Sequence, residues 1–231
     1  MTRRSPDTLL DDVSERLQAR VEVIKPKLRG WLHLATAPLA FFSFVVMLVI
    51  ADDPLARAGA AVFMVSSLAL FVVSAVYHTG RWHESVQLAL KRIDHSNIFI
   101  MIAGSYTPFS LLLLSGSHAA IMLSLVWGGA LLGVVFKVFW LSAPRWIYVP
   151  LYLVLGWAAV LYWPEFVDAA PTAGLVLMIV GGGLYTLGAL VYGFKWPDPF
   201  PRWFGFHEVF HTLTIAAFIV HYVGVSLLVY G

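Results

Sequence analysis

The chain has 231 residues, of which 60% are hydrophobic and 12% are charged, with a mean hydropathy of +0.81. Soluble domains have about 25% charged residues, so this composition argues against a soluble domain and predicts a polytopic membrane protein. The formal charge of +2 argues against nucleic-acid binding, and the absence of cysteine excludes disulfides and thiolate metal sites.

Seven stretches are suited to crossing a membrane, which takes about 20 mostly apolar residues. In chain order, we expect spans at Trp31–Ala51, Ala58–Thr79, Ile93–Leu114, His118–Trp140, Trp146–Trp163, Thr172–Gly193 and Phe204–Tyr230. The connecting segments are short and contain no inserted soluble domain. The sequence therefore predicts an all-α membrane protein, with a single seven-transmembrane helix bundle over residues 31–231.

The basic residues predict an orientation, because cytoplasmic loops carry an excess of lysine and arginine. Fourteen of the fifteen lysines and arginines precede the first span or lie around the loops after spans two, four and six, and Arg57 lies on the opposite side. We therefore expect a cytoplasmic N-terminus, a C-terminus on the outside, and a multi-pass protein of the cell inner (plasma) membrane.

Residues 1–30 form a charged segment that we expect on the cytoplasmic side. Val13, Leu17, Val21 and Ile24 recur at helical spacing among charged residues, which is typical of an interfacial helix lying on the membrane. A solvated tail is the alternative interpretation. The segment has no leading apolar region, so we expect no cleavable signal peptide.

Several ionisable side chains lie inside the predicted spans, where they are costly and mark candidate functional sites. His78 lies near the cytoplasmic end of span two, and Ser74 lies one turn deeper on the same face. Asp94 opens span three at that side of the membrane. His207 and His211, one helical turn apart, open span seven there too. We therefore expect these side chains, from three helices, to share one layer.

Three imidazoles, from His78, His207 and His211, are suited to binding one metal ion. Zinc prefers such ligands, and three protein ligands plus one water are typical of catalytic zinc. Zinc lowers the pKa of its bound water to about 7, and we expect Asp94 to orient that water and take its proton. Ser74 would donate to a substrate oxyanion or support the ligands. Iron and manganese accept the same ligand types.

Simpler interpretations exist for the same residues. Histidines near lipid headgroups need no metal. Asp94 and Glu208 are suited to capping spans three and seven, because acidic side chains are favoured at helix N-termini. The sequence alone leaves these alternatives open.

The remaining histidines are weaker candidates for the metal site than His78, His207 and His211. We expect interfacial or solvated side chains at His33, His83 and His118. On a helix His95 points about 100° away from Asp94, which makes it a weak candidate for supporting the site. His221 lies about 21 Å further along span seven than His207, so it lines a cavity or bonds across helices rather than joining the same ion.

Pro108 lies in the middle of span three, in the segment GSYTPFSLLLL. Proline removes one backbone hydrogen bond, so we expect a kink, with Ser105, Tyr106 or Thr107 bonding the freed carbonyl. A kink would open a cavity beside the site, and simple packing is the alternative.

The combined motifs resemble the hemolysin III family, the bacterial branch of the progestin and adipoQ receptors, which include the adiponectin receptors. The resemblance rests on Ser74-x-x-x-His78, on Asp94, on the segment AGSYTPF at residues 103–109, and on PDPFPRWFGFHEVFH before span seven. It covers nearly the whole seven-span core. It implies a seven-helix bundle with an intracellular N-terminus, and zinc held by His78, His207 and His211. It also implies that Asp94 contacts the zinc-bound water, with Ser74 nearby.

The resemblance also implies a function, because the wider group contains membrane hydrolases such as the alkaline ceramidases, which act on lipid amides. We therefore expect a zinc-dependent hydrolase of a lipid-like amide or ester, with a membrane lipid as substrate or ligand and a role in membrane lipid homeostasis. Two alternatives remain: a receptor or sensor with a structural zinc ion, and a haemolysin-like pore or transporter that causes cytolysis. Span seven has no lysine, which argues against retinal binding.

Overall fold

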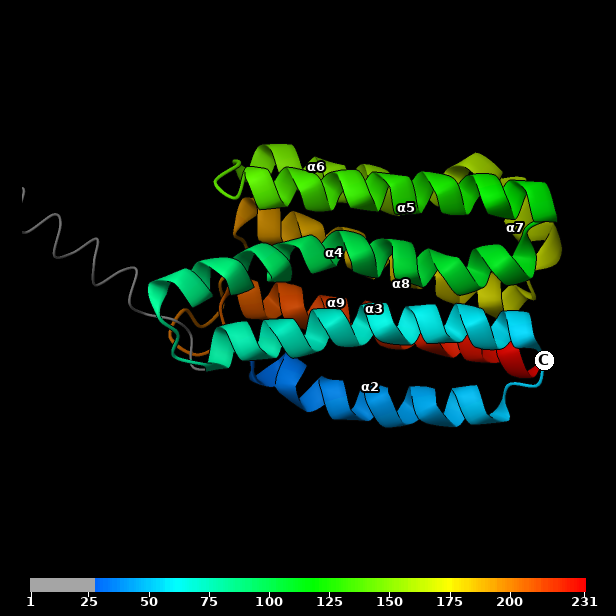
Figure 1. Ribbon diagram of the computed structural model, residues 1–231, viewed down its shortest axis with the longest axis horizontal. Coiled ribbons are helices and arrows are strands. Elements are labelled where there is room, and N and C mark those ends of the chain that lie inside the picture. Colours follow the sequence, from blue (N-terminus) through cyan, green and yellow to red (C-terminus); the bar gives the residue numbers. More distant parts are fainter. Residues whose placement is uncertain (1–27) are drawn as a thin grey trace, which may run out of the picture.

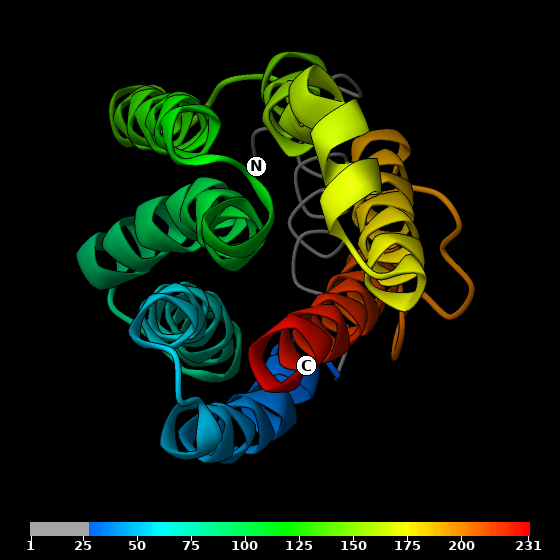
Figure 2. The ribbon, with the colours of Figure 1, turned by 90° about the vertical axis from the view of Figure 1, so that its right-hand side faces the viewer.

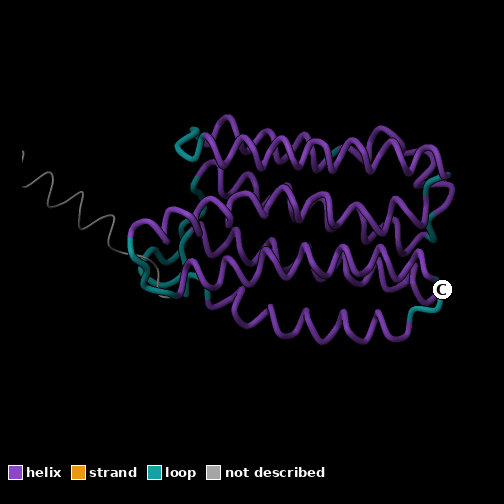
Figure 3. Tube along the Cα trace, in the orientation of Figure 1, coloured by secondary structure: helices purple, strands orange, loops and turns teal. Residues whose placement is uncertain are grey.

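The computed structural model describes residues 28–231, and this part of the chain is all helical (Figure 1, Figure 3). The interfacial helix expected in the N-terminal segment lies outside the described residues. The helices, labelled as in Figure 1, are α2 (Trp31–Ile50), α3 (Pro54–Thr79), α4 (Glu84–Leu113), α5 (Gly116–Phe139), α6 (Arg145–Gly156), the 3-10 helix η1 (Ala158–Tyr162), α7 (Trp163–Ala169), α8 (Thr172–Phe194) and α9 (Phe206–Tyr230).

Seven helical segments are long and apolar enough to cross a membrane, with α6, η1 and α7 together forming the fifth. This confirms the prediction of an all-α protein with seven spans. The connections are short, so successive spans run in opposite directions. As a result, the start of α2, the end of α3 and the start of α9 all lie at the left end of Figure 1, and the C-terminus lies at the right end.

The last helix lies beside the first ones. Consecutive helices pack against each other from α2 to α5, and α8 packs along α9. Helix α9 also contacts α2, α3 and α4, and in the end-on view of Figure 2 it lies next to α2 and closes the bundle. This closure brings α2 and α9, which are far apart in the sequence, into contact, so side chains of α2, α3 and α9 can build one site.

Aromatic rings hold α9 in this position. Phe218 of α9 has its ring centroid 5.7 Å from that of Phe63 and 5.0 Å from that of Phe71, both on α3. Phe44 of α2 lies 5.3 Å from Phe63 in an edge-to-face contact. All four rings are buried. Within a membrane such close van der Waals packing is a main source of helix association.

The fifth predicted span, Trp146–Trp163, is not one continuous helix. Helix α6 ends at Gly156, and η1 and α7 complete the crossing. The Tyr106 hydroxyl donates a hydrogen bond of 2.6 Å to the Gly156 carbonyl and accepts one of 3.0 Å from the Ala159 amide. A broken helix is tolerated at membrane depth when such partners satisfy its free backbone groups.

The three residues expected to hydrogen-bond the backbone carbonyl freed by Pro108 bond other groups instead. Helix α4 continues through Pro108, which leaves the Gly104 carbonyl without its helical donor. The hydroxyls of Ser105 and Thr107 donate to the carbonyls of Ile102 and Ala103 instead. The Tyr106 hydroxyl bonds the break in the fifth span, so the expected role of these three residues at Pro108 is wrong.

Candidate metal centre

Three histidines meet at one end of the bundle. His78 lies in the last turn of α3, and His207 and His211 lie in the first two turns of α9. One ring nitrogen of each lies within 4.8 Å of the others, a spacing that can hold a metal ion. The ring centroids are 4.5 to 5.4 Å apart. We call this group the His triad, and its end of the bundle the triad end.

The chemistry of the His triad fits a metal ion. The His207 Nε2 and His211 Nδ1 atoms are buried, and neither has a hydrogen-bond partner among the described residues. A buried polar atom left unsatisfied costs about 1–3 kcal/mol, so such lone pairs need a ligand. Neutral imidazole nitrogens are good donors to zinc and to other transition metals. The triad predicted from the sequence is therefore assembled and can hold a metal ion.

The start of α9 is fixed by a buried carboxylate. Glu208 is fully buried, and its Oε2 accepts a hydrogen bond of 2.8 Å from the Gly205 amide at the N-cap. Its Oε1 accepts a bond of 2.9 Å from Arg29, which precedes α2. The predicted capping role of Glu208 is confirmed. Because Glu208 follows His207 directly, the cap and the ion pair also position the triad.

Removing this carboxylate should destabilise the protein. We expect Glu208→Ala to lower the free energy of unfolding by about 3 kcal/mol, because Arg29 loses its buried partner and the Gly205 amide loses its acceptor. Thermal unfolding of the purified protein in detergent measures the change. Glu165→Ala is the control, because its pair with His118 is partly exposed. Equal melting temperatures for the two variants would contradict this account of Glu208.

Asp94 lies beside the triad, inside α4 rather than at its start. The helix begins at Glu84 instead of Ile93, so the alternative that Asp94 caps this helix is wrong. Its Oδ2 lies 3.9 Å from His78 Nε2, and its carboxyl group is hydrogen-bonded by the buried hydroxyl of Ser74. Polar residues at 84–92 obscured the helix start, because they resemble a loop in a search for apolar spans.

His33 is part of this site, which the sequence did not predict. Its ring is 2% exposed and stacks on His211, with centroids 4.0 Å apart and planes at 16°. Both its nitrogens are buried without a hydrogen-bond partner among the described residues. The expectation of an interfacial or solvated side chain at His33 is therefore wrong.

The turn before α2 explains the position of His33. Gly30 has φ 88°, a left-handed conformation that favours glycine. A Cβ atom there would lie 2.7 Å from the Cβ of His78. The turn therefore brings the start of α2 directly against α3. An isolated Gly-Trp-Leu-His segment contains no such distance information, so hydropathy placed His33 at an interface.

The other histidines lie outside the His triad. His95 donates from Nδ1 to the Lys91 carbonyl at 2.7 Å, and its Nε2 lies 3.4 Å from the Tyr192 hydroxyl. The Tyr192 ring in turn packs 5.7 Å from the His207 ring, so His95 supports the site through a neighbour. His118 is 44% exposed and pairs with Glu165, and His83 is exposed, as expected.

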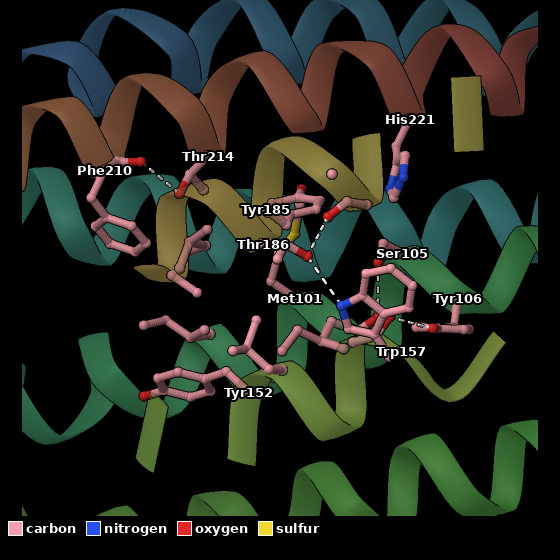
Figure 4. A pocket seen from close by; sticks show the side chains of 18 of the residues that line it. Met101, Ser105, Tyr106, Tyr152, Trp157, Tyr185, Thr186, Phe210, Thr214 and His221 are labelled. Carbon is pink, nitrogen blue, oxygen red and sulfur yellow. Dashed lines mark hydrogen bonds between the residues drawn. The ribbon is translucent and has the colours of Figure 1, made fainter. Parts of the chain in front are cut away.

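A cavity of about 700 Å³ opens beside the triad. Its wall is mostly apolar and comes from α2, α3, α4, α6, η1, α7, α8 and α9. Asp94, His207 and His211 line it at the triad end, and Tyr185 and His221 line it further along (Figure 4). Its volume is within the range of sites for small organic ligands, about 300–1,000 Å³.

Comparisons with known proteins agree with this arrangement. The family described as Haemolysin-III related matches residues 21–222. Hemolysin-3 homolog of Bacillus subtilis is 34% identical over 67% of this chain and 69% of its own length, and Hemolysin-3 of Bacillus cereus is 25% identical over 78% and 84%. Adiponectin receptor protein of Drosophila melanogaster is 29% identical over 71% of this chain and 41% of its own length.

Proposed function

The chain belongs to the haemolysin-III related family, and from that premise we propose that it is a zinc-dependent hydrolase that cleaves an amide or ester of a membrane lipid. One observation carries the proposal: a triad that can hold a metal, with a carboxylate beside it, faces an apolar cavity of about 700 Å³. Hydrolysis needs such polar groups, and a lipid chain needs such a cavity. Neither the triad with its carboxylate nor the apolar cavity would by itself indicate a lipid hydrolase.

His78, His207 and His211 would hold the ion. Three neutral imidazoles favour zinc, and a zinc ion in such a site supplies Lewis-acid activation of a carbonyl group and of a water molecule. Arg29 and Glu208 fix the start of α9, and thereby the positions of His207 and His211 in the bundle. A matched set of ligands held on two rigid helices is suited to repeated turnover.

Asp94 is the group that moves the proton. Its Oδ2, the oxygen nearest His78, accepts a proton from the water whose oxygen adds to the carbonyl carbon of the lipid. The bond from that carbon to the leaving nitrogen or oxygen then breaks, and Asp94 passes the proton to the leaving group. The products are a fatty acid and an amine or alcohol. Ser74 keeps the carboxyl group in place through its hydrogen bond.

Turnover by purified protein tests this proposal. The protein is reconstituted in lipid vesicles with ceramide and a panel of other N-acyl and O-acyl lipids, and released fatty acid is measured by mass spectrometry. We expect release in the presence of zinc, loss of release after chelation, and recovery when zinc is restored. If protein with its zinc in place released no fatty acid from any lipid of the panel, the proposed hydrolase activity would be contradicted.

A sensor is the second candidate. A relative is an adiponectin receptor protein, and the triad joins α3 to α9 while Arg29–Glu208 joins the start of α2 to α9. A metal in this position would act as a clamp that closes the bundle. Bound zinc together with no turnover, and unfolding at lower temperature after chelation, would favour this candidate.

The membrane orientation is part of the proposal. We place the N-terminus and the triad end in the cytoplasm and the C-terminus outside, in the inner (plasma) membrane, on the basis of the basic residues. Residues 31–231 then form one seven-transmembrane domain that follows the cytoplasmic segment 1–30. The triad would act on lipid from the cytoplasmic leaflet.

The chain has no cysteine, so one introduced cysteine reports the orientation. We expect a membrane-impermeant maleimide to label Asp52→Cys, in the exposed α2–α3 loop, in intact cells. Ser142→Cys, in the exposed α5–α6 loop, should react only after the cells are opened. The reverse pattern would place the triad on the outside.

A further inference from the structure

Two buried polar side-chain atoms far from the triad have no hydrogen-bond partner in the part of the chain that the structure describes. The Tyr185 hydroxyl on α8 and the His221 Nδ1 on α9 are both buried, and neither has a hydrogen-bond partner among the described residues. Both side chains line the same cavity as the triad (Figure 4), and their ring centroids lie 5.5 Å apart. Unsatisfied polar atoms in an apolar wall indicate a place for a polar ligand group.

The position of the His221 ring is fixed by its neighbours. A Cβ atom on Gly181 of α8 would lie 2.1 Å from the ring, so only glycine allows this close approach. The Phe109 ring packs edge-on at 5.5 Å. Nε2 lies 3.3 Å from the Met178 carbonyl, which can only accept a hydrogen bond. The ring therefore carries a proton on Nε2 and donates it, and Nδ1 is left with a buried, unpartnered lone pair on a ring that lines the cavity.

The two atoms together match a group that both accepts and donates hydrogen bonds. The Tyr185 hydroxyl can donate a hydrogen bond and the His221 Nδ1 can accept one. A hydroxyl group both accepts and donates hydrogen bonds, so it has the two capacities that these atoms need. A ketone would leave His221 without a donor, a carboxylate would set its negative charge against the Nδ1 lone pair, and a methylene would leave both atoms unsatisfied.

The spacing along α9 places this pair well away from the triad. His211 and His221 are ten residues apart, which corresponds to about 15 Å along the helix axis. Thr214 lies between them, but its hydroxyl already donates to the Phe210 carbonyl. The side chains of Met101 and Phe210 form part of the apolar wall of the cavity (Figure 4). The cavity is therefore polar at the triad, mostly apolar along its length, and polar again at Tyr185 and His221.

We propose that Tyr185 and His221 form a second polar subsite that binds a hydroxyl group on the hydrocarbon chain of the lipid ligand. The inference rests on the proposed function insofar as the lipid head group lies at the triad. It narrows the ligand class to lipids with a mid-chain hydroxyl, about 15 Å from the head group.

Binding of two fatty acids tests the subsite. Oleic acid and ricinoleic acid differ only in a mid-chain hydroxyl, and their affinities for the purified zinc-loaded protein can be measured by displacement of a fluorescent fatty acid. We expect ricinoleic acid to bind about tenfold more tightly, which corresponds to about 1.4 kcal/mol. Tyr185→Phe removes only the hydroxyl and should reduce the preference to about twofold, with the affinity for oleic acid unchanged or higher.

Tyr222→Phe is the matched control. Its hydroxyl bonds the Ser43 carbonyl at 2.8 Å, and the residue does not line the cavity, so this variant should keep the full preference. Equal binding of the two acids by the native protein would overturn the subsite, as would a preference that survives Tyr185→Phe. Neither readout needs turnover. A protein that prefers ricinoleic acid but cleaves no lipid would contradict the hydrolase alone, and cleavage without that preference would contradict the subsite alone.

Discussion

Replacing His207 and His211 together by alanine removes the bound metal. His78 is then the one triad ligand left, and a single imidazole cannot hold a zinc ion against the usual set of three or four ligands. Metal analysis of the protein purified with zinc should fall from about one ion per chain to below about a tenth of that value. The single variants should fall less, because two ligands remain in each.

A matched pair of histidines supplies the control for this experiment. His83 is exposed and His118 forms a partly exposed pair with Glu165, and neither belongs to the triad. His83→Ala combined with His118→Ala removes the same number of imidazoles and should leave the metal content unchanged. If zinc persists without His207 and His211, the ion lies elsewhere and the triad is not the metal centre.

Asp94→Asn abolishes hydrolysis but keeps the metal. Asparagine has almost the same shape and still accepts a hydrogen bond from Ser74, but it cannot take a proton from water. Loss of a general base costs about 10²–10⁴ in rate, so fatty acid release should fall by at least a hundredfold. Metal analysis and fatty acid release are measured on the same preparation, so a change in one can be compared with the other.

Glu165→Gln is the control for Asp94→Asn, because it removes a carboxylate from the surface pair with His118. It should retain full activity. Two results would count against the proposed role of Asp94. Unchanged release would place the base on another residue, and loss of the metal would mean that Asp94 holds the ion rather than moving a proton.

The number of spans and the members of the triad could be predicted from the sequence. Seven apolar stretches with short connections allow few arrangements, and the alternation of direction sets which ends meet. That alternation alone placed His78, His207 and His211 in one layer. The four-residue spacing of His207 and His211 then put both on one face of a helix.

Other features depend on contacts that hydropathy does not encode. His33 packs on His211 because Gly30 turns the chain against α3, and a left-handed turn cannot be recognised from one glycine. The break at Gly156 depends on Tyr106, a residue fifty positions earlier that satisfies the free backbone groups. The cavity depends on side chains from eight helical segments, so its volume follows from packing rather than from any one motif.

His221 illustrates both what the sequence predicts and what only the tertiary contacts show. Its distance along the last helix excluded it from the triad at the level of the sequence, and the structure places it away from those ligands. The sequence alone does not distinguish a side chain that lines a cavity from one that bonds across helices. It does both, since Nε2 faces the Met178 carbonyl of α8 and the ring lines the cavity.

X-ray absorption spectroscopy of the purified protein at the zinc edge tests the central claim most directly, because it reports the atoms around the metal. We predict three imidazole ligands in the native protein and loss of that signal in the variant without His207 and His211. A zinc environment of oxygen ligands alone, or an imidazole signal that survives the double substitution, would contradict the assignment of the His triad as the metal centre.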